Sequence, residues 1–301
     1  RFYLDTRGQD LGQIEAQHIR FHAVLREARE AVPSDWRQAR AGRADLDRFL
    51  FGPEDVVIAV GQDGLVANVA KYLDGQPVLG INPAPDLYDG VLVRVPLDRL
   101  AKLLPAASHH DAAVERRTMV EALTDAGERL LALNEIFVGH RSHQSARYLI
   151  AEGRGQENQS SSGLIVASGT GATGWARSIM LASGEQLALD PQERAVGYFV
   201  REPFPSIATG TQLRAGKLEG RGLSITSRMN DGGVVFADGV KRRFPFQIFW
   251  AHIETGDRHC GHAAGKRGRR ARDHLICRGA TGRRPRDYRR QGYLPQSGGY
   301  P

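Results

Sequence analysis

The chain has 301 residues, of which 41% are hydrophobic and 25% charged, and its formal net charge at pH 7 is +7. This length and composition predict a globular protein with room for two domains. No apolar run approaches the roughly 20 residues that a membrane-spanning helix needs, and the first residues lack a signal-peptide pattern, so we expect a soluble cytoplasmic protein. The chain does not start with Met, so we also expect residues upstream of Arg1.

The positive charge is concentrated at the end of the chain. Residues 251–301 carry 12 Lys and Arg against 4 Asp and Glu, which leaves residues 1–250 with a net charge of −1. Cys260 and Cys277 also lie in this segment, so a disulfide framework is excluded for the body. We interpret residues 251–301 as a basic tail that is disordered or frame-shifted. Any contact with nucleic acid is expected to be non-specific and made through this tail.

The first 105 residues have the pattern of a Rossmann-like α/β domain. A surface helix with one buried stripe is expected from about Leu11 to Glu30. Asp55–Val60 is a continuous apolar run that predicts a strand buried on both faces. Helical spacing from Leu65 to Leu73 and a second strand pattern over Gln76–Asn82 complete a strand, helix, strand unit. Such a unit implies a parallel pair of strands.

Short strand patterns separated by Gly, Ser and Asn clusters dominate residues 106–250, and the domain boundary is expected near residue 105. A polar stretch from Ser108 to Leu123 is compatible with a helix. The pattern that follows favours a β-rich domain, and analogy favours a sandwich-like or multi-sheet arrangement of its strands over a barrel. Its strands are expected at Leu130–Val138, Arg147–Ala151, Leu164–Ala167, Leu223–Thr226 and Val234–Ala237.

The first candidate site is the turn Gly61-Gln62-Asp63-Gly64, which joins the buried strand to a helix. Backbone N–H groups and the positive end of a helix dipole meet at such a point, which suits phosphate. Gly61 and Gly64 allow close approach of the backbone, and Asp63 adds a carboxylate. Taken alone, this turn is more often ordinary turn chemistry. Lys71 and Arg94 are interpreted as solvated surface charges, with phosphate contact as the alternative.

Two further segments carry residues suited to a nucleoside. In Asn134-Glu135 an amide and a carboxylate begin an apolar strand, where both can reach a sugar; the alternative is a simply exposed side chain. From Ser162 to Ser178 a strand enters a loop of Gly, Ser and Thr and then a helix, with Trp175 as an apolar wall for a base. The alternative for this loop is a flexible linker.

Taken in this order, the segments resemble the NAD kinase family, most closely the branch that includes the mitochondrial enzyme of animals. The resemblance covers roughly residues 50–245 and implies an α/β domain, a β-rich domain and NAD bound between them. It is carried by Gly61–Gly64, Gly80-Ile81-Asn82, Asn134-Glu135, Thr170-Gly171-Ala172-Thr173, Val200-Arg201-Glu202-Pro203 and Ala237-Asp238-Gly239.

The resemblance also implies roles for the matched residues. Asp63 would be the catalytic aspartate that activates the 2′-hydroxyl of the adenosine ribose of NAD, while Gly61 and Gly64 would bind phosphate. ATP or polyphosphate would be the phosphoryl donor, with Mg²⁺ or another divalent cation whose ligands the sequence does not identify. The protein would be a homodimer or tetramer. The NAD-binding residues would be Asn82, Asn134, Glu135, Ser162, Thr170, Gly171, Thr173, Gly174, Trp175 and Ser178.

Several positions depart from the family pattern. Gln62 replaces the second glycine of the turn, Leu65 a usual threonine, and Ser162 an aspartate found in many members; the resemblance stops near His252. Two other functions therefore stay open. One is a non-catalytic NAD(P)-binding protein, and the other is a lipid kinase of the diacylglycerol type, which also uses a Gly-Gly-Asp-Gly turn.

Overall fold

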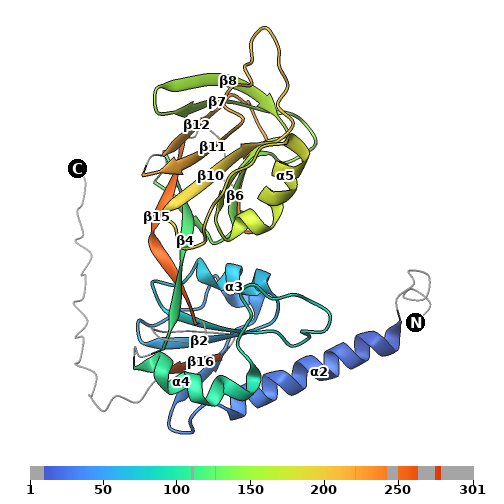
Figure 1. Cartoon of the computed structure of the whole chain (residues 1–301), viewed down its shortest axis with the longest axis vertical. Helices are drawn as coiled ribbons and strands as arrows, with labels where there is room; N and C mark the ends of the chain where they lie inside the picture. Colours follow the sequence, from blue (N-terminus) through green and yellow to red (C-terminus); the bar gives the residue numbers. More distant parts are fainter. Residues whose placement is uncertain are drawn as a thin grey trace, which may run out of the picture.

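Two lobes make up the molecule, an α/β lobe and a β-rich lobe, joined by two long strands (Figure 1). The computed structural model describes residues 10–109, 112–125, 127–220, 222–242, 250–263 and 275–278, with side chains described up to residue 239. The helices are α2 (Leu11–Glu30), α3 (Asp63–Ala70), α4 (Leu100–Ser108) and α5 (Trp175–Ser183), with short 3₁₀ turns η1 (Arg43–Asp45), η2 (Leu97–Arg99) and η3 (Gly171–Thr173).

Within the described residues, the strands form one sheet of ten strands and one of six. The larger sheet has the order β1-β16-β2-β3-β15-β12-β7-β8, with β4 beside β15 and β5 beside β4; the smaller has the order β11-β10-β9-β6-β13-β14. The bounds are β1 (Arg37–Arg40), β2 (Asp55–Val60), β3 (Pro77–Ile81), β4 (Val114–Thr124), β5 (Arg129–Ala132), β6 (Glu135–His140), β7 (Ala146–Glu152), β8 (Gly155–Ser161), β9 (Leu164–Ser168), β10 (Ala195–Val200), β11 (Ala215–Glu219), β12 (Leu223–Ser227), β13 (Gly233–Ala237), β14 (Val240–Arg242), β15 (Trp250–Ala263) and β16 (Leu275–Arg278).

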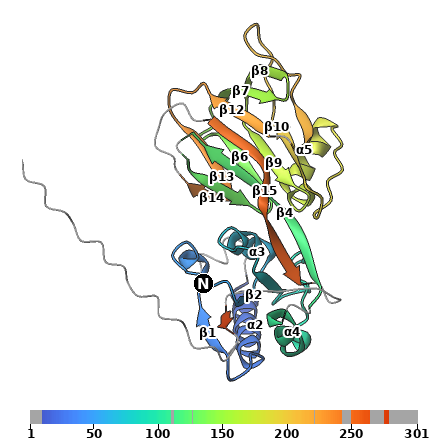
Figure 2. The ribbon, with the colours of Figure 1, turned by 90° about the vertical axis from the view of Figure 1, so that its left-hand side faces the viewer.

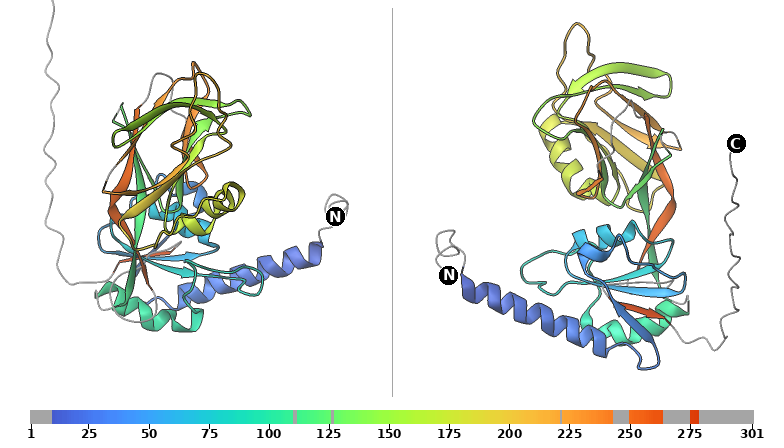
Figure 3. Two further views of the ribbon diagram at one scale, coloured as in Figure 1. Left: turned by 45° about the horizontal axis from the view of Figure 1, so that its top comes forward. Right: turned by 180° about the vertical axis from the view of Figure 1, so that it is seen from behind.

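The α/β lobe confirms the predicted strand, helix, strand unit. Every residue of β2 and β3 is buried, and the two strands pair in parallel, with Ile58 opposite Leu79. One face of these strands packs against α2 and α4, and the other packs against α3. Helix α2 has its predicted bounds, but its first half is exposed and extends beyond the lobe (Figure 3). The lobe therefore carries α3 on the side that faces the β-rich lobe (Figure 1).

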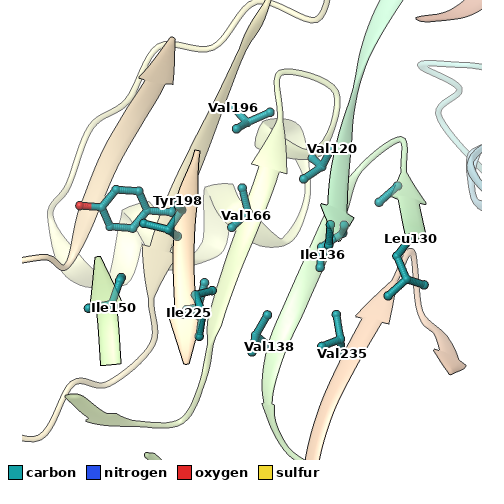
Figure 4. Close-up of a cluster of buried hydrophobic side chains, with 14 of the residues drawn as sticks. Val120, Leu130, Ile136, Val138, Ile150, Val166, Val196, Tyr198, Ile225 and Val235 are labelled. Carbon is teal, nitrogen blue, oxygen red and sulfur yellow. The ribbon is translucent and has the colours of Figure 1, made fainter. Parts of the chain in front are cut away.

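The β-rich lobe has a core between its two sheets, as the sandwich-like prediction required. Val120, Ile150 and Ile225 come from the larger sheet, and Val166 and Val196 come from the smaller one (Figure 4). Each of these side chains is at most 1% exposed, and full burial of such a side chain contributes about 1.5–3 kcal/mol. The apolar alternation of the strands therefore holds the two sheets face to face.

The helix predicted around Ser108–Leu123 is wrong, because this stretch contains β4, and the helix α4 lies before it. The polar residues hid the strand, since several of them are buried with partners. Arg117 is 2% exposed and pairs with Glu115, and the buried Glu121 pairs with Arg129. The boundary expected at residue 105 falls inside α4, and the two-domain division stays a proposal.

The structure also differs from the predicted tail. β15 pairs with β12 and β4 in the β-rich lobe and then lies parallel to β3 in the α/β lobe, and β16 lies between β1 and β2 (Figure 2). The prediction of disorder is therefore wrong for residues 251–263 and 275–278, because backbone pairing places charged residues in strands. The rest of residues 251–301 lies outside the described residues. In the described part of the chain, no helix is both long and apolar enough to cross a bilayer.

Candidate functional site

The turn Gly61–Gly64, here called the Asp63 turn, lies where β2 ends and α3 begins. The Asp63 carboxylate accepts backbone N–H groups from the segment after β3: Oδ1 from Leu92 and Val93 at 2.8 and 3.1 Å, and Oδ2 from Val91 at 2.9 Å. A carboxylate offers about four acceptor sites. Three of these acceptor sites are therefore used by the hydrogen bonds that fasten the loop. Among the described residues, no further hydrogen bond uses the second acceptor site of Oδ2.

The two glycines of the Asp63 turn have different surroundings. The Gly61 N–H donates to the Ile81 carbonyl at 3.0 Å, and a Cβ on Gly61 would lie 3.0 Å from Cδ2 of Leu65. A Cβ on Gly64 would have no atom within 4 Å. Packing within the described chain therefore does not require glycine at position 64, and the outer side of the turn is open to a ligand.

Asn82 lies at the end of β3 and organises the loop that follows. Its Oδ1 accepts the Ala84 N–H at 3.0 Å, and its Nδ2 donates to the Tyr88 carbonyl at 2.7 Å. The same loop continues to the residues fastened by Asp63. Asn82 follows Ile81, whose carbonyl accepts the Gly61 N–H, so Asn82 lies close to the Asp63 turn. Its side chain makes its hydrogen bonds within its own loop.

The chain bends between β5 and β6 at Leu133–Glu135, here called the Glu135 corner. The buried Asp238 carboxylate accepts the backbone N–H groups of Leu133, Asn134 and Glu135 at 2.9, 2.9 and 3.3 Å. Asp238 also donates its own N–H to the Glu135 carbonyl at 3.1 Å. Its φ of +47° lies in a region that residues other than glycine adopt rarely. Sequence reasoning assigned Asp238 no role, and its only signal was the matched segment Ala237–Gly239.

The loop after β9 packs against this corner. The Ser168 hydroxyl donates to the Leu133 carbonyl and accepts the N–H groups of Thr170 and Gly171 at 3.1 and 3.2 Å. A Cβ on Gly171 would lie 2.1 Å from the Asn134 carbonyl oxygen, so only glycine fits there. The structure therefore brings together four predicted site residues, Asn134, Glu135, Thr170 and Gly171.

Arg117 on β4 packs against this loop from the interior of the protein. Arg117 was not predicted from the sequence as a site residue. Its Nη1 donates to Thr170 Oγ1 at 3.1 Å, while Nη2 lies 2.6 Å from the Glu115 carboxylate. Thr173 donates its hydroxyl to the Thr170 carbonyl at 2.9 Å and is exposed. The side chain of Thr170 therefore faces inward to Arg117, and the end of the loop at Thr173 faces solvent.

Lys71, at the C-terminal end of α3, connects the two lobes. Its Nζ donates to Oδ1 of Asn68 at 3.1 Å and to the carbonyl of Ala237 at 3.0 Å. Asn68 in turn donates to the Gly64 carbonyl at 2.6 Å. The interpretation of Lys71 as a solvated surface charge is therefore wrong, while Arg94 is exposed as expected.

The electrostatics of the Glu135 corner follow from its burial. Burial and the nearby Asp238 together raise the pKa of the Glu135 carboxyl to about 7, against the lowering effect of Lys71. Burial also raises the pKa of Asp238, against the lowering effect of Lys71 and of the three N–H donors. The corner is therefore a cluster of two carboxyl groups and one ammonium group, in which Glu135 changes charge near neutral pH.

Two of the remaining predicted residues, Trp175 and Ser178, lie at a pocket of about 510 Å³ beside α5. Trp175 stacks on Phe137 with ring centres 5.6 Å apart, and the Arg201 guanidinium lies 5.2 Å from the centre of the indole. Trp175, Ser178 and Arg201 line the pocket, whose size suits a small molecule. Arg201 also donates to the Ser162 carbonyl at 3.4 Å, so Ser162 belongs to this side of the site. The exposed Gly174 caps α5 between the pocket and the Glu135 corner.

The described residues contain no group of three or more His, Cys, Asp and Glu side chains that could hold a metal ion. Both oxygens of Asp63 already accept backbone N–H groups. Mg²⁺ in nucleotide sites is often held by one or two carboxylates together with substrate phosphates and water. The donor set therefore fits a cation that arrives with phosphate better than one held by the protein alone.

Comparisons by sequence found curated relatives over part of the chain. An NAD kinase of Acidovorax sp. (strain JS42) is 33% identical over 132 residues, and one of Paraburkholderia phytofirmans is 29% identical over 132 residues. The matches cover 41% of this chain and 43% of each relative, so the chain matches less than half the length of these proteins. No family model matches the chain.

Comparisons by structure found the same group of proteins. An NAD kinase from Archaeoglobus fulgidus in complex with ATP superposes with a TM-score of 0.52 and 21% identity, covering 69% of this chain and 77% of that one. A yeast NADH kinase complexed with NADH has a TM-score of 0.55 and 16% identity, covering 71% and 66%. At these identities the structures show the fold alone, and the likeness to the mitochondrial-type branch stays a prediction. The sequence matches over part of the chain and the shared fold make this chain similar to NAD kinases.

Proposed function

We propose that this chain transfers the γ-phosphoryl group of ATP to the 2′-hydroxyl of the adenosine ribose of NAD and so makes NADP. The observation that carries the proposal is the position of the Asp63 turn on α3, the helix that Lys71 connects to the segment beside the Glu135 corner. The Asp63 turn, which is suited to phosphate, then lies on the α/β side of the interface between the lobes. The Glu135 corner, which is suited to ribose, lies on the β-rich side. The names of the relatives support the same activity.

Asp63 would act on the accepting hydroxyl through Oδ2. Its three backbone bonds fix the carboxylate, and the remaining acceptor site on Oδ2 can receive the ribose O–H. As the hydroxyl oxygen forms its bond to the γ-phosphorus and the bond to the leaving ADP oxygen breaks, the hydroxyl proton passes to Oδ2. Fixing the angle of attack contributes along with taking the proton, because the carboxylate does not need to reorient.

The acceptor would be held by the Glu135 corner and the adjoining loop. Glu135 in its ionised form accepts hydrogen bonds from ribose hydroxyls, as acidic residues do in dinucleotide sites. Asn134, Thr170, Gly171 and Thr173 would line the same region, and Trp175 with Ser178 would offer the pocket beside α5 to a base. Asn82 and Ser162 remain proposed contacts at the margins of this site.

The donor phosphates would meet the Asp63 turn. Gly64 leaves open space beside the first N–H groups of α3, where the helix dipole favours negative charge. A divalent cation bound with ATP would neutralise phosphate charge, and polyphosphate is an alternative donor. We further propose a homodimer or tetramer in the cytoplasm, with nucleic acid bound only non-specifically through the basic residues 251–301.

One assay tests the proposed function: the full chain with NAD, ATP and Mg²⁺, followed through an NADP-specific dehydrogenase. We expect NADP to form with the wild-type chain and much more slowly with Asp63→Asn. NAD binding by calorimetry without any NADP would favour a non-catalytic NAD(P)-binding protein. Phosphorylation of diacylglycerol in the absence of NADP formation would favour the lipid kinase. Either of these results would overturn the proposal.

A further inference from the structure

We propose that Lys71 and Asp238 are a pair of positioning residues that holds the Glu135 corner against α3 and keeps Glu135 able to bind ribose as a carboxylate. This inference rests on the proposed function, but its first readout, the pKa of Glu135 in the chain without nucleotide, does not depend on it. Lys71, just after α3 of the α/β lobe, donates to the carbonyl of Ala237 at the end of β13 of the β-rich lobe, and Asp238 is the next residue.

The backbone contacts of Asp238 set the shape of the corner. Its carboxylate gathers three consecutive N–H groups of Leu133–Glu135, and its own N–H returns to the Glu135 carbonyl. Four hydrogen bonds from one residue therefore fix the backbone that carries Asn134 and Glu135. Asp238 keeps an unusual positive φ to make them, which indicates that the surrounding contacts outweigh the conformational cost.

Lys71 attaches this unit to α3. Its ammonium donates to the carbonyl of Ala237, the residue before Asp238, and to Asn68 on the preceding turn of its own helix. The helix between Asp63 and Lys71 spans about 12 Å at 1.5 Å per residue. Asp63, the proposed catalytic residue, is the first residue of α3, and Lys71, which contacts the segment beside the Glu135 corner, directly follows its last. The length of this one helix therefore fixes the distance between the two residues.

Charge gives Lys71 a second effect on Glu135. The charged groups that act on the Glu135 carboxyl are Asp238, from the turn after β13, and Lys71, from α3. Asp238 favours the neutral form of Glu135, and Lys71 favours the ionised form. The Lys71 ammonium thus keeps the half-buried Glu135 available as an acceptor near neutral pH, which a neutral side chain at position 71 would not do.

The experiment measures the Glu135 pKa directly, in the full chain without nucleotide, by carboxyl NMR of ¹³C-glutamate. The Glu135 signal is assigned by its loss in Glu135→Gln. We compare Lys71→Met, Lys71→Gln, Lys71→Arg and Asp238→Asn with wild type. Lys71→Gln keeps an N–H donor for the Ala237 carbonyl without the charge, so it keeps the test available if Lys71→Met does not fold. Lys102→Met and Asp98→Asn remove the same charges from exposed positions.

The expected shifts have opposite signs. Lys71→Met and Lys71→Gln should raise the Glu135 pKa, Lys71→Arg should restore it, Asp238→Asn should lower it, and the two exposed controls should leave it unchanged. A merely structural role would loosen the corner in Lys71→Met, Lys71→Gln and Asp238→Asn alike and lower the Glu135 pKa toward its ordinary value in all three. A fall or no change in the folded Lys71→Met or Lys71→Gln protein would therefore overturn the proposal.

A second readout links the pair to the site. At pH 7, Lys71→Gln should weaken NAD binding on the order of tenfold, because less Glu135 is ionised, with little effect on ATP binding. Unchanged NAD affinity in this variant would also overturn the proposal. If the wild-type chain forms no NADP but the Glu135 pKa shifts as expected, the proposed function fails and the positioning pair stands.

Discussion

Two aspartates of this chain make the same contacts in different environments. Asp63 accepts three consecutive backbone N–H groups of Val91–Val93, and Asp238 accepts three of Leu133–Glu135. Asp63 begins a helix and is partly exposed, whereas Asp238 is 9% exposed and lies beside Glu135 and Lys71. The same carboxylate geometry therefore fastens a loop at the Asp63 turn and a strand corner at the Glu135 corner.

Accessibility separates the two roles. A carboxylate that receives a substrate hydroxyl needs a lone pair that the substrate can reach, and Oδ2 of Asp63 accepts from Val91 alone among the described residues. A carboxylate that positions backbone can be buried, because its partners are already in place. The comparison assigns reaction chemistry to the Asp63 turn and ligand positioning to the Glu135 corner, and four predictions test this assignment.

The largest effect is expected at the Asp63 turn. Asp63→Asn keeps one oxygen for backbone N–H groups, but its amide nitrogen can neither accept from Val91 nor receive the ribose hydroxyl. Turnover should fall roughly 10²-fold or more, the scale of a lost general base, while NAD affinity stays within a few-fold. Steady-state kinetics and calorimetry on the same preparation measure both quantities.

If Asp63→Asn lost thermal stability along with turnover, the role of Asp63 would be to fasten the loop and not to act on the substrate. Asp98→Asn, an exposed change of the same kind, controls for the loss of charge. Equal turnover in wild type and Asp63→Asn would remove Asp63 from the mechanism and end the contrast with Asp238.

The next effect concerns selectivity at the Glu135 corner. Glu135→Gln and Thr173→Val each remove a hydrogen-bonding partner of the proposed dinucleotide, which should cost about 1–3 kcal/mol, or roughly 5- to 150-fold in NAD affinity. ATP affinity should change little, because its phosphates are expected at the Asp63 turn. Glu128→Gln, on an exposed position, is the control. Unchanged NAD affinity in both folded variants would contradict the proposed acceptor site.

The contrast between the two aspartates also explains what the sequence could predict. The Asp63 turn is local: a buried strand, a glycine turn and a helix follow one another within 16 residues, so pattern and dipole arguments locate it. The Glu135 corner depends on Asp238, more than 100 residues away, and on Lys71 from the other lobe. The spacing of apolar residues within one segment cannot predict a contact between segments that lie so far apart in the sequence. From the residues alone, Asn134 and Glu135 could either contact a sugar or be simply exposed, and the family resemblance favoured the ligand role.

The same reasoning applies to the fold. The strands β2, β3, β7, β9, β12 and β13 were predicted from the residues themselves. The single strand predicted over Leu130–Val138 is wrong, because the chain bends at the Glu135 corner and forms β5 and β6 instead. β4 was missed because Arg117 and Glu121 are polar and buried, and their partners lie on the same strand, on β5 and in the Thr170 loop. β15 and β16 were missed because pairing with distant strands determines them, while their charged composition favours a tail.

The third prediction uses the raised pKa of Glu135. Ionised Glu135 accepts from ribose, so NAD affinity should rise about tenfold between pH 6 and pH 8, centred on the pKa of about 7. The raised pKa contributes stability that is fully present below pH 4.5 and is lost as pH rises through about 7. Glu135→Gln should abolish both dependences. Calorimetric and denaturant titrations across this range measure them, and a pH-independent NAD affinity in wild type would contradict the assignment.

The smallest effect is expected from the glycines, and it separates the Asp63 turn from the Glu135 corner once more. Gly64→Ala adds a Cβ with no atom within 4 Å inside a helix, so the free energy of unfolding should stay equal or rise by about 0.5–1 kcal/mol. If donor phosphate approaches the backbone there, the KM for ATP should still rise a few-fold. Gly171→Ala places its Cβ 2.1 Å from the Asn134 carbonyl and should instead lower stability by about 1–3 kcal/mol and weaken NAD binding. Denaturant unfolding with kinetics in both nucleotides distinguishes the two variants. An unchanged KM for ATP in Gly64→Ala would show that the donor phosphates do not bind at the Asp63 turn. The added methyl group contacts no atom of the described chain, so a bound phosphate is the only group that it could disturb.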